Sequence, residues 1–128
     1  MSLVRSQNTR FELDILRLLS AELYPLGYRY RKHCRSLTGT PDMVFPKFKL
    51  AVFFDSDFWH GRNFARLAPK MTPVWRAKIL RNMQRDRQVN RKLRRLGWSV
   101  LRFGESRIKN RPHTVVRRVK IELEKRAS

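Results

Sequence analysis

Hydrophobic residues recur with two different periods along the chain, and the change of period predicts where helices and strands lie. From Thr9 to about Tyr24 the apolar positions follow a helical spacing, which a proline and a glycine then interrupt. Two runs rich in Val and Phe, Met43–Phe45 and Leu50–Phe54, flank a short polar connection. This pattern predicts a helix followed by a β-hairpin.

The rest of the chain continues this alternation of elements. Residues 28–33 alternate aromatic and basic side chains like an edge strand, and residues 62–72 are polar and irregular. A long helical pattern covers 74–96 and stops at a glycine, residues 98–103 form a further strand, and a last helix covers about 112–126. We therefore expect one α/β (α+β) domain over residues 1–128, with two or three antiparallel strands.

The apolar positions also predict which helix faces are buried. These faces are Phe11, Ile15, Leu18, Leu19 and Leu23 in the first helix, Trp75, Ile79, Met83, Val89, Leu93 and Leu96 in the second, and Val115, Val116, Val119 and Leu123 in the last. Asp86 falls about 20° from Trp75 on the helical wheel, inside the apolar stripe. A buried charge is paired or binds a metal. Two explanations of Asp86 are open: it forms an ion pair with an arginine of the same helix, or it belongs to a catalytic site. We favour the catalytic site.

Two further acids meet at the hairpin. If Pro46 and Ala51 close it, Asp42 and Asp55 are directly opposed, with Cβ atoms about 5 Å apart. Two carboxylates at this distance resist ionising together unless a cation neutralises them. Mg²⁺ suits such oxygen ligands, so we expect a magnesium site at the mouth of the hairpin. A slip of one residue would send Asp55 to the opposite face.

Glu12 has two interpretations. The run Thr9-Arg10-Phe11-Glu12 fits a capping box, in which Glu12 reaches back to the first residue of the helix. Alternatively Glu12, about 100° around the helix from Phe11, points toward the acids of the hairpin. The spacing favours neither.

Composition points to a polyanionic partner. The net charge is +20, and residues 62–128 hold 21 Lys or Arg against four acids. Double-stranded DNA is the expected partner, because a basic half of this kind is the electrostatic mark of nucleic-acid binding. Cys34 is the only cysteine, so no disulfide framework or cysteine zinc site is expected. Without an apolar signal or membrane-spanning stretch, we expect a cytoplasmic, nucleoid-associated protein that binds no membrane.

Several side chains near these acids have both a catalytic or DNA-binding interpretation and a structural one. His60 follows Asp55 by five residues and is a candidate base for a metal-bound water. Phe58, Trp59 and Trp75 either serve the core or wedge between base pairs. The bases of the long helix either form a solvated face or contact phosphates, and we favour phosphate contact for Arg76, Lys78, Arg81 and Arg85.

These residues resemble one known family. Thr9–Glu12, Gly39–Asp42, Ala51–Gly61, Asn82–Asp86 and the run Leu96-Gly-Trp-Ser-Val-Leu are similar to the very-short-patch mismatch-repair endonucleases and related homing endonucleases of the PD-(D/E)XK superfamily. The resemblance covers about residues 5–105. It implies a restriction-endonuclease-like fold, with a central mixed sheet flanked by helices, and magnesium-dependent hydrolysis of DNA without a small-molecule cofactor.

The resemblance also implies roles. Asp42 is the principal metal ligand, His60 the base, Glu12 and Asp86 supporting acids, and Phe58, Trp59 and Trp75 the aromatic wedge. Asp55 stands where the best-known repair enzymes have histidine, and Asp57 stands where the superfamily has lysine. Against the pattern of the repair enzymes, we expect neither their structural zinc ligands nor their longer N-terminal arm.

Three functions follow, in order of preference. The first is nicking near a T:G mismatch, the second is cutting as a homing endonuclease, and the third is non-catalytic DNA binding. Whether one chain or two act together stays open.

Overall fold

A four-stranded mixed sheet forms the centre of the protein. The computed structural model describes residues 2–56 and 64–128, with side chains from residue 10 onward. The strands β1 (Arg31–Lys32), β2 (Met43–Phe45), β3 (Leu50–Asp55) and β4 (Ser99–Gly104) lie in this order across the sheet. The pairs β1–β2 and β2–β3 are antiparallel, whereas β3 and β4 are parallel. This sheet confirms the predicted mixed α+β fold.

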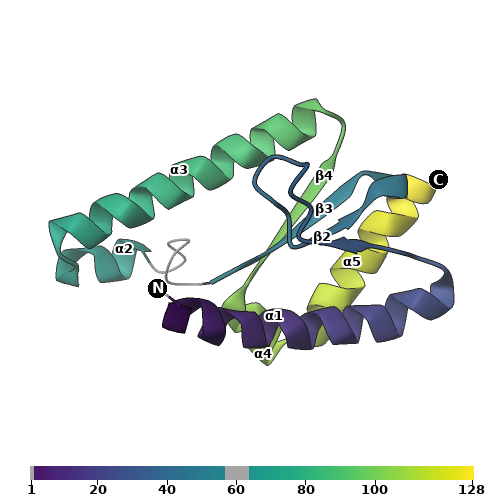
Figure 1. The fold of residues 1–128 in the computed structure, drawn as a ribbon, viewed down its shortest axis with the longest axis horizontal. Helices are drawn as coiled ribbons and strands as arrows, with labels where there is room; N and C mark the ends of the chain where they lie inside the picture. The colour runs from purple at the N-terminus through teal and green to yellow at the C-terminus, as the bar shows by residue number, and fades with distance from the viewer. Residues whose placement is uncertain (1, 57–63) are drawn as a thin grey trace.

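Helices cover both faces of the sheet (Figure 1). Three lie on one face, α1 (Ser2–Leu23), α4 (Glu105–Asn110) and α5 (Pro112–Ala127). The long helix α3 (Pro73–Arg95) packs on the other face, after the short α2 (Phe64–Leu67) and a 3₁₀ turn at Ala68–Lys70. The arrangement is consistent with the restriction-endonuclease-like fold.

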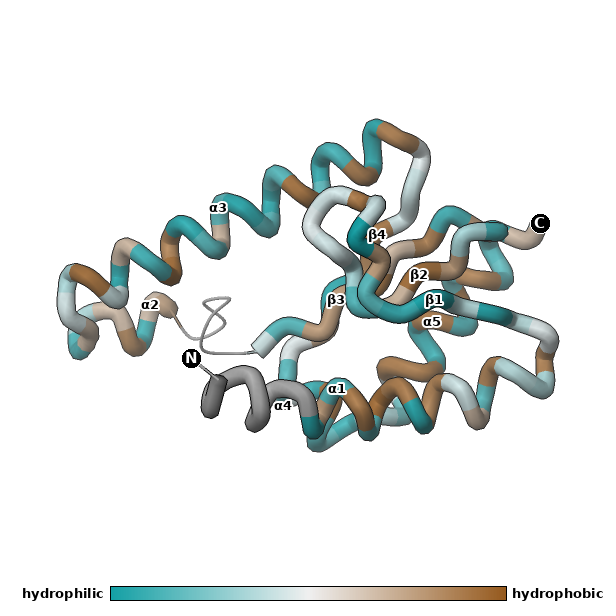
Figure 2. Tube along the Cα trace, viewed as in Figure 1, coloured by the Kyte–Doolittle hydropathy of each residue, from teal (hydrophilic) through white to brown (hydrophobic). Residues whose placement is uncertain are grey.

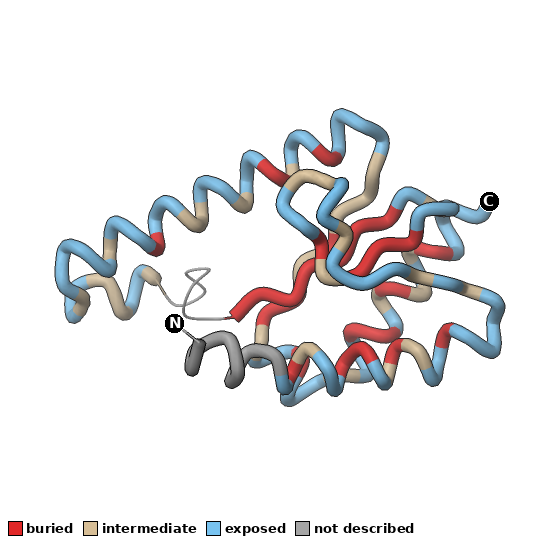
Figure 3. Tube along the Cα trace, in the orientation of Figure 1, coloured by how far each residue is buried: buried red, intermediate tan, exposed pale blue. Residues whose placement is uncertain are grey.

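Each face of the sheet has its own hydrophobic cluster. Every residue of β3 is buried (Figure 3). Its hydrophobic side chains alternate between the two clusters. On the α1–α5 side, the larger cluster contains the four predicted inner residues of the last helix. On the α3 side, the smaller cluster joins Val44, Ala51 and Phe53 to Val89 and Leu93. Most of α3 is hydrophilic, with isolated apolar positions (Figure 2).

The predicted start of the first helix was wrong. Helix α1 begins at Ser2, so Thr9 lies inside it and the capping box at Thr9–Glu12 does not exist. Residues 2–9 contain no glycine or proline, and the backbone therefore continues as a helix through this segment. Glu12 is an interior position of α1 rather than part of its cap.

The predicted hairpin register was wrong by two residues. The strands are as expected, but Phe45 and Leu50 form the closing pair instead of Pro46 and Ala51. Pro46 begins a 3₁₀ turn, and Lys49 closes it in a left-handed conformation with φ of 51°. Because side chains alternate along a strand, a shift of two residues keeps Asp42 on the face of Asp55. The two acids share a face without being directly opposed.

The long helix has the predicted span within one residue at each end. Its C-terminus carries a Schellman motif, because Gly97 and Trp98 donate backbone hydrogen bonds to the carbonyls of Arg94 and Leu93. Its buried stripe is shorter than expected. Trp75 is 40% exposed and Leu96 54% exposed, so the expectation that both are buried was wrong. The N-terminal half of α3 extends past the sheet and has less to pack against (Figure 1).

Smaller differences lie in the connecting segments. The expected edge strand over 28–33 is only the two residues of β1, and β4 begins one residue later than predicted. Residues 64–70 are helical rather than irregular, and α4 was not predicted. None of the helices in the described ranges combines the length and apolar character that a membrane-crossing helix needs.

Candidate active site

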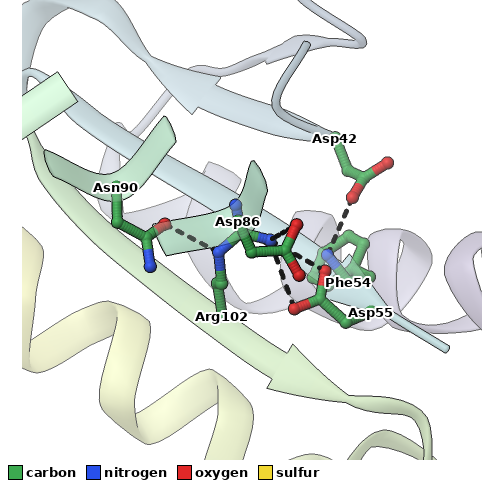
Figure 4. Close-up of polar contacts among 6 residues, drawn as sticks. All are labelled: Asp42, Phe54, Asp55, Asp86, Asn90 and Arg102. Atoms are coloured by element: carbon green, nitrogen blue, oxygen red, sulfur yellow. Dashed lines mark hydrogen bonds and ion pairs between the residues drawn. The ribbon is translucent and has the colours of Figure 1, made fainter. Parts of the chain in front are cut away.

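Asp42 is held at the point where the hairpin opens. Its Oδ2 accepts a hydrogen bond of 2.7 Å from the backbone N–H of Phe54 on β3 (Figure 4). Its Oδ1 lies 3.8 Å from Nδ1 of His33. Burial raises the pKa of Asp42, and the charge of Asp55 raises it further, while the Phe54 hydrogen bond and His33 oppose the rise. The carboxyl group is therefore fixed in place but poorly solvated.

Glu12 faces the same region from α1. Burial, and then the charge of Asp42, raise its pKa from 4.5 to about 7. Because Asp42 acts on this pKa, the two carboxyl groups are electrostatic neighbours. This agrees with the interpretation in which Glu12 points toward the acids of the hairpin.

Asp55 belongs to a second group of polar side chains, centred on Arg102 of β4 (Figure 4). Nη1 of Arg102 donates to both carboxylate oxygens of Asp55, at 3.1 and 3.3 Å. The same nitrogen lies 3.5 Å from Oδ1 of Asp86 on α3. Nε of Arg102 donates to Oδ1 of Asn90, one helical turn further along α3, at 2.7 Å.

Asp86 is therefore half-buried and turned toward the sheet, as its place in the apolar stripe predicts. Its partner in this ion pair is Arg102 of β4, so Asp86 does form an internal ion pair, here with an arginine of a strand and not of its own helix. Asp86 and Asp55 come together because both approach the same guanidinium group. Asp55 and Asp86, both predicted site residues, thus meet at one end of the sheet.

The donor set fits a divalent cation in its chemistry and charge. Within the described ranges, no three or more His, Cys, Asp and Glu side chains are grouped as metal ligands. However, the charge of Asp42 raises the pKa of Glu12, and that of Asp55 raises the pKa of Asp42. A divalent cation among these oxygen donors reverses such shifts, because it favours the ionised form of each carboxyl group. The assignment of Asp42 and Asp55 as metal ligands stays a prediction.

Not every predicted site residue can be placed. The candidate base His60 and the wedge candidates Phe58 and Trp59 lie outside the described residues, as does Asp57. Trp75 lies on the exposed N-terminal part of α3, where Nζ of Lys78 is 5.1 Å from the centroid of its ring.

The residues of α3 that we predicted to contact phosphates differ in how exposed their side chains are. Arg81 and Arg85 are exposed. Arg76 instead turns onto the backbone, where it donates to the carbonyl oxygen of Met71 at 3.1 Å. Arg81 and Arg85 are therefore more accessible to a bound duplex than Arg76 is.

The sequence interpretation missed three residues of this site. Arg102 alternates with Leu101 and Phe103, and this alternation alone places it on the α3 face of β4. Asn90 lies four residues after Asp86, hence on the same side of α3. No sequence pattern indicated His33, because its approach to Asp42 depends on the left-handed backbone conformation of His33 itself, with φ of 45°.

Comparisons with known proteins identify relatives of this chain. The family described as DNA mismatch endonuclease Vsr matches residues 1–66. The type II nicking enzyme V.NmeDIP of Neisseria meningitidis serogroup C is 41% identical over 102 residues, which are 77% of this chain and 66% of that protein. The type II nicking enzyme V.HpaIIP of Haemophilus parainfluenzae is 41% identical over 83% of this chain and 75% of its own length. DNA mismatch endonuclease Vsr of Escherichia coli K12 is 29% identical over 87% of this chain and 70% of its own.

Proposed function

The chain belongs to the Vsr family of DNA mismatch endonucleases, and from this premise we propose that it nicks double-stranded DNA beside a T:G mismatch in a magnesium-dependent hydrolysis. The observation that carries the proposal is a linked series of acids, in which Glu12 is the electrostatic neighbour of Asp42, Asp42 that of Asp55, and Asp55 is joined to Asp86 through Arg102. Burial and neighbouring acids raise the pKa of Glu12 and of Asp42, so these carboxylates are costly in the folded metal-free protein, which is typical of a functional site.

The carboxyl groups have different tasks in this proposal. Asp42 is the principal ligand of the Mg²⁺ ion, with Asp55 as the second ligand. A bound Mg²⁺ ion polarises a phosphate oxygen and makes water a better nucleophile. The Phe54 N–H fixes the direction of the Asp42 carboxylate, since it occupies Oδ2 and leaves Oδ1 toward His33. Glu12 and Asp86 support these acids, and His60 takes the proton from the attacking water.

The basic surface of α3 supports binding to a duplex. The helix has 23 residues and is therefore about 35 Å long, the length of about ten base pairs. Trp75, Lys78, Arg81 and Arg85 are exposed along it, and near its C-terminus Arg87, Arg91, Arg94 and Arg95 line a hollow of about 510 Å³ with Asn90. In the proposal these bases contact phosphates, and the exposed ring of Trp75 takes part in the wedge.

Asp42→Asn tests the assignment of the metal ligand. The substitution removes one charge and keeps the shape, so we expect the single-turnover nicking rate to fall at least about 100-fold. Binding of the same duplex in EDTA should be unchanged or tighter, because a negative charge near phosphates is lost. Asp14→Asn, which makes the same change at an exposed position of α1, is the matched control and should cleave normally.

The same variants separate an enzyme from a binding module. If Asp42→Asn nicks at the rate of the unsubstituted protein, Asp42 does not bind the essential metal ion and the proposal fails. If the unsubstituted protein cuts matched and mismatched duplexes equally, the nuclease part stands and the mismatch part is overturned.

A further inference from the structure

Arg102 has an unusual position for an arginine. It lies in the middle of β4, opposite Phe53 of β3 in the parallel register, and its side chain is only 17% exposed. Its neighbours Leu101 and Phe103 point to the α1–α5 side, so Arg102 points to the α3 side. A buried guanidinium group is costly unless it is paired and hydrogen-bonded.

The partners of Arg102 come from two elements, β3 and α3. Nη1 binds Asp55 at the end of β3 and approaches Asp86 of α3, while Nε binds Asn90 of α3. The guanidinium carbon also lies 4.0 Å from the centroid of the Phe53 ring, in a cation–π contact. Arginine suits this place because its planar group carries several donors in fixed directions, whereas lysine offers a single point charge.

We propose that Arg102 is a positioning residue of the nuclease site, which holds the carboxylates of Asp55 and Asp86 in place for the reaction. The inference rests on the proposed function and deepens it. Arg102 offsets one of the negative charges that meet at this end of the sheet, and it fastens α3 to the end of β3. It acts through the two acids and does not contact DNA.

The surroundings distinguish this role from phosphate binding. The bases that we assign to phosphates, such as Arg81 and Arg85, are exposed on the outer side of α3. Arg102 is enclosed between β3, β4 and α3, and its hydrogen-bonded nitrogens point to side-chain oxygens (Figure 4). Nη1 and Nε are thus already bound to side chains of the protein.

The test compares Arg102→Gln and Arg102→Lys with the unsubstituted protein. We expect the single-turnover rate at saturating duplex to fall roughly 10- to 100-fold in Arg102→Gln, as for other residues that orient metal ligands. Arg102→Lys should recover part of the rate, because it keeps the charge and loses the second donor. The dissociation constant of the duplex in EDTA and the slope of its salt dependence should stay unchanged in both variants.

Arg107→Gln is the matched control. Arg107 binds Thr114 in the α4–α5 region and stacks on Phe103, away from the acids, so its loss should leave the nicking rate unchanged. Thermal unfolding of each variant shows whether a lower rate reflects lost folding. If Arg102→Gln is unfolded at the assay temperature, Asn90→Ala replaces it, since this change removes only the acceptor of Nε.

A double-mutant cycle shows whether Arg102 acts through Asp55. Arg102→Gln should slow Asp55→Asn clearly less than it slows the unsubstituted protein, because one of the two acids through which it acts is already lost. If the Asp55→Asn rate is below detection, Asp86→Asn takes its place in the cycle. If the double variant loses the sum of the activation free energies that the two single variants lose, the proposal is overturned.

Two other outcomes overturn it as well. They are an unchanged rate in folded Arg102→Gln, and a salt slope reduced by about one with weaker binding, which indicates a direct phosphate contact. If the unsubstituted protein does not nick DNA, the proposed function fails, and this inference fails with it.

Discussion

Replacing Glu12 by Gln is expected to stabilise the metal-free protein at neutral and higher pH. Burial and the charge of Asp42 raise the pKa of Glu12 from 4.5 to about 7, so the folded state disfavours the ionised carboxylate. Glutamine has nearly the same shape and never ionises. The substitution therefore removes a cost that the folded protein bears only when Glu12 is charged.

The pH dependence follows from the two pKa values. Below 4.5 Glu12 is protonated in both the folded and the unfolded chain, and between 4.5 and about 7 only the unfolded chain releases the proton. The free energy of unfolding thus falls as the pH rises through this interval, and the loss is complete above the folded pKa. The full shift corresponds to about 3 kcal/mol. Because Glu12 is only half-buried, solvent screening reduces the expected gain of Glu12→Gln to about 1–2 kcal/mol.

Urea unfolding in EDTA measures this gain directly. Glu12→Gln should be more stable than the unsubstituted protein by this amount near pH 8, and the difference should vanish near about pH 4. Asp14→Asn removes an exposed charge two residues further along α1 and should not reproduce the effect. Magnesium ions should reduce the difference, because a cation near Glu12 and Asp42 relieves their repulsion.

Equal stability of Glu12→Gln and the unsubstituted protein at pH values above the folded pKa would refute this reasoning. It would mean that Glu12 is well solvated or that a basic side chain neutralises it. The electrostatic support for a cation between Glu12 and Asp42 would then be lost.

Two packing predictions test how the loop before β2 and helix α3 hold the site, each by urea unfolding with a matched control. Gly39→Ala should destabilise the fold by about 2–4 kcal/mol, because the added Cβ would lie 2.5 Å from Cγ1 of Val89 and residue 39 has a φ of 81°. The control Gly27→Ala places its Cβ in open space and should cost only about 1 kcal/mol. Equal costs would contradict the predicted clash. Leu93→Ala should lower the free energy of unfolding by about 2–5 kcal/mol, because Leu93 is fully buried. The control Leu96→Ala, at an exposed position, should change it by less than about 0.5 kcal/mol. A small loss at Leu93 would mean that α3 is not anchored there.

Local pattern was sufficient to predict most of the fold. The inner face of α5 and the two strands of the hairpin follow from the spacing of hydrophobic residues along the chain. The exposure of Trp75 does not follow from any period, because it depends on how far α3 extends beyond the sheet. The register error arose at Pro46, where the 3₁₀ turn shifts the closing pair and no pattern of the strands reveals it.

The acids of the candidate site could be picked out from the sequence, but the side chains that they contact could not. Asp86 was recognisable because a carboxylate in an apolar stripe needs an explanation, and its side chain does turn toward the sheet. The pairing of Asp55 and Asp86 with Arg102 joins residues far apart in the chain, and it depends on β4 lying parallel to β3. Sequence spacing carries no information about such a contact.

Strand-resolved cleavage of a duplex with one T:G mismatch tests the central proposal most directly. Each strand carries its own label, and the reaction is followed in Mg²⁺ and in EDTA beside the fully matched duplex. We expect one nick, in one strand of the mismatched duplex, that requires Mg²⁺ and is lost in Asp42→Asn. Cleavage that persists in EDTA or in Asp42→Asn, or no cleavage of a duplex that the protein binds, would contradict it.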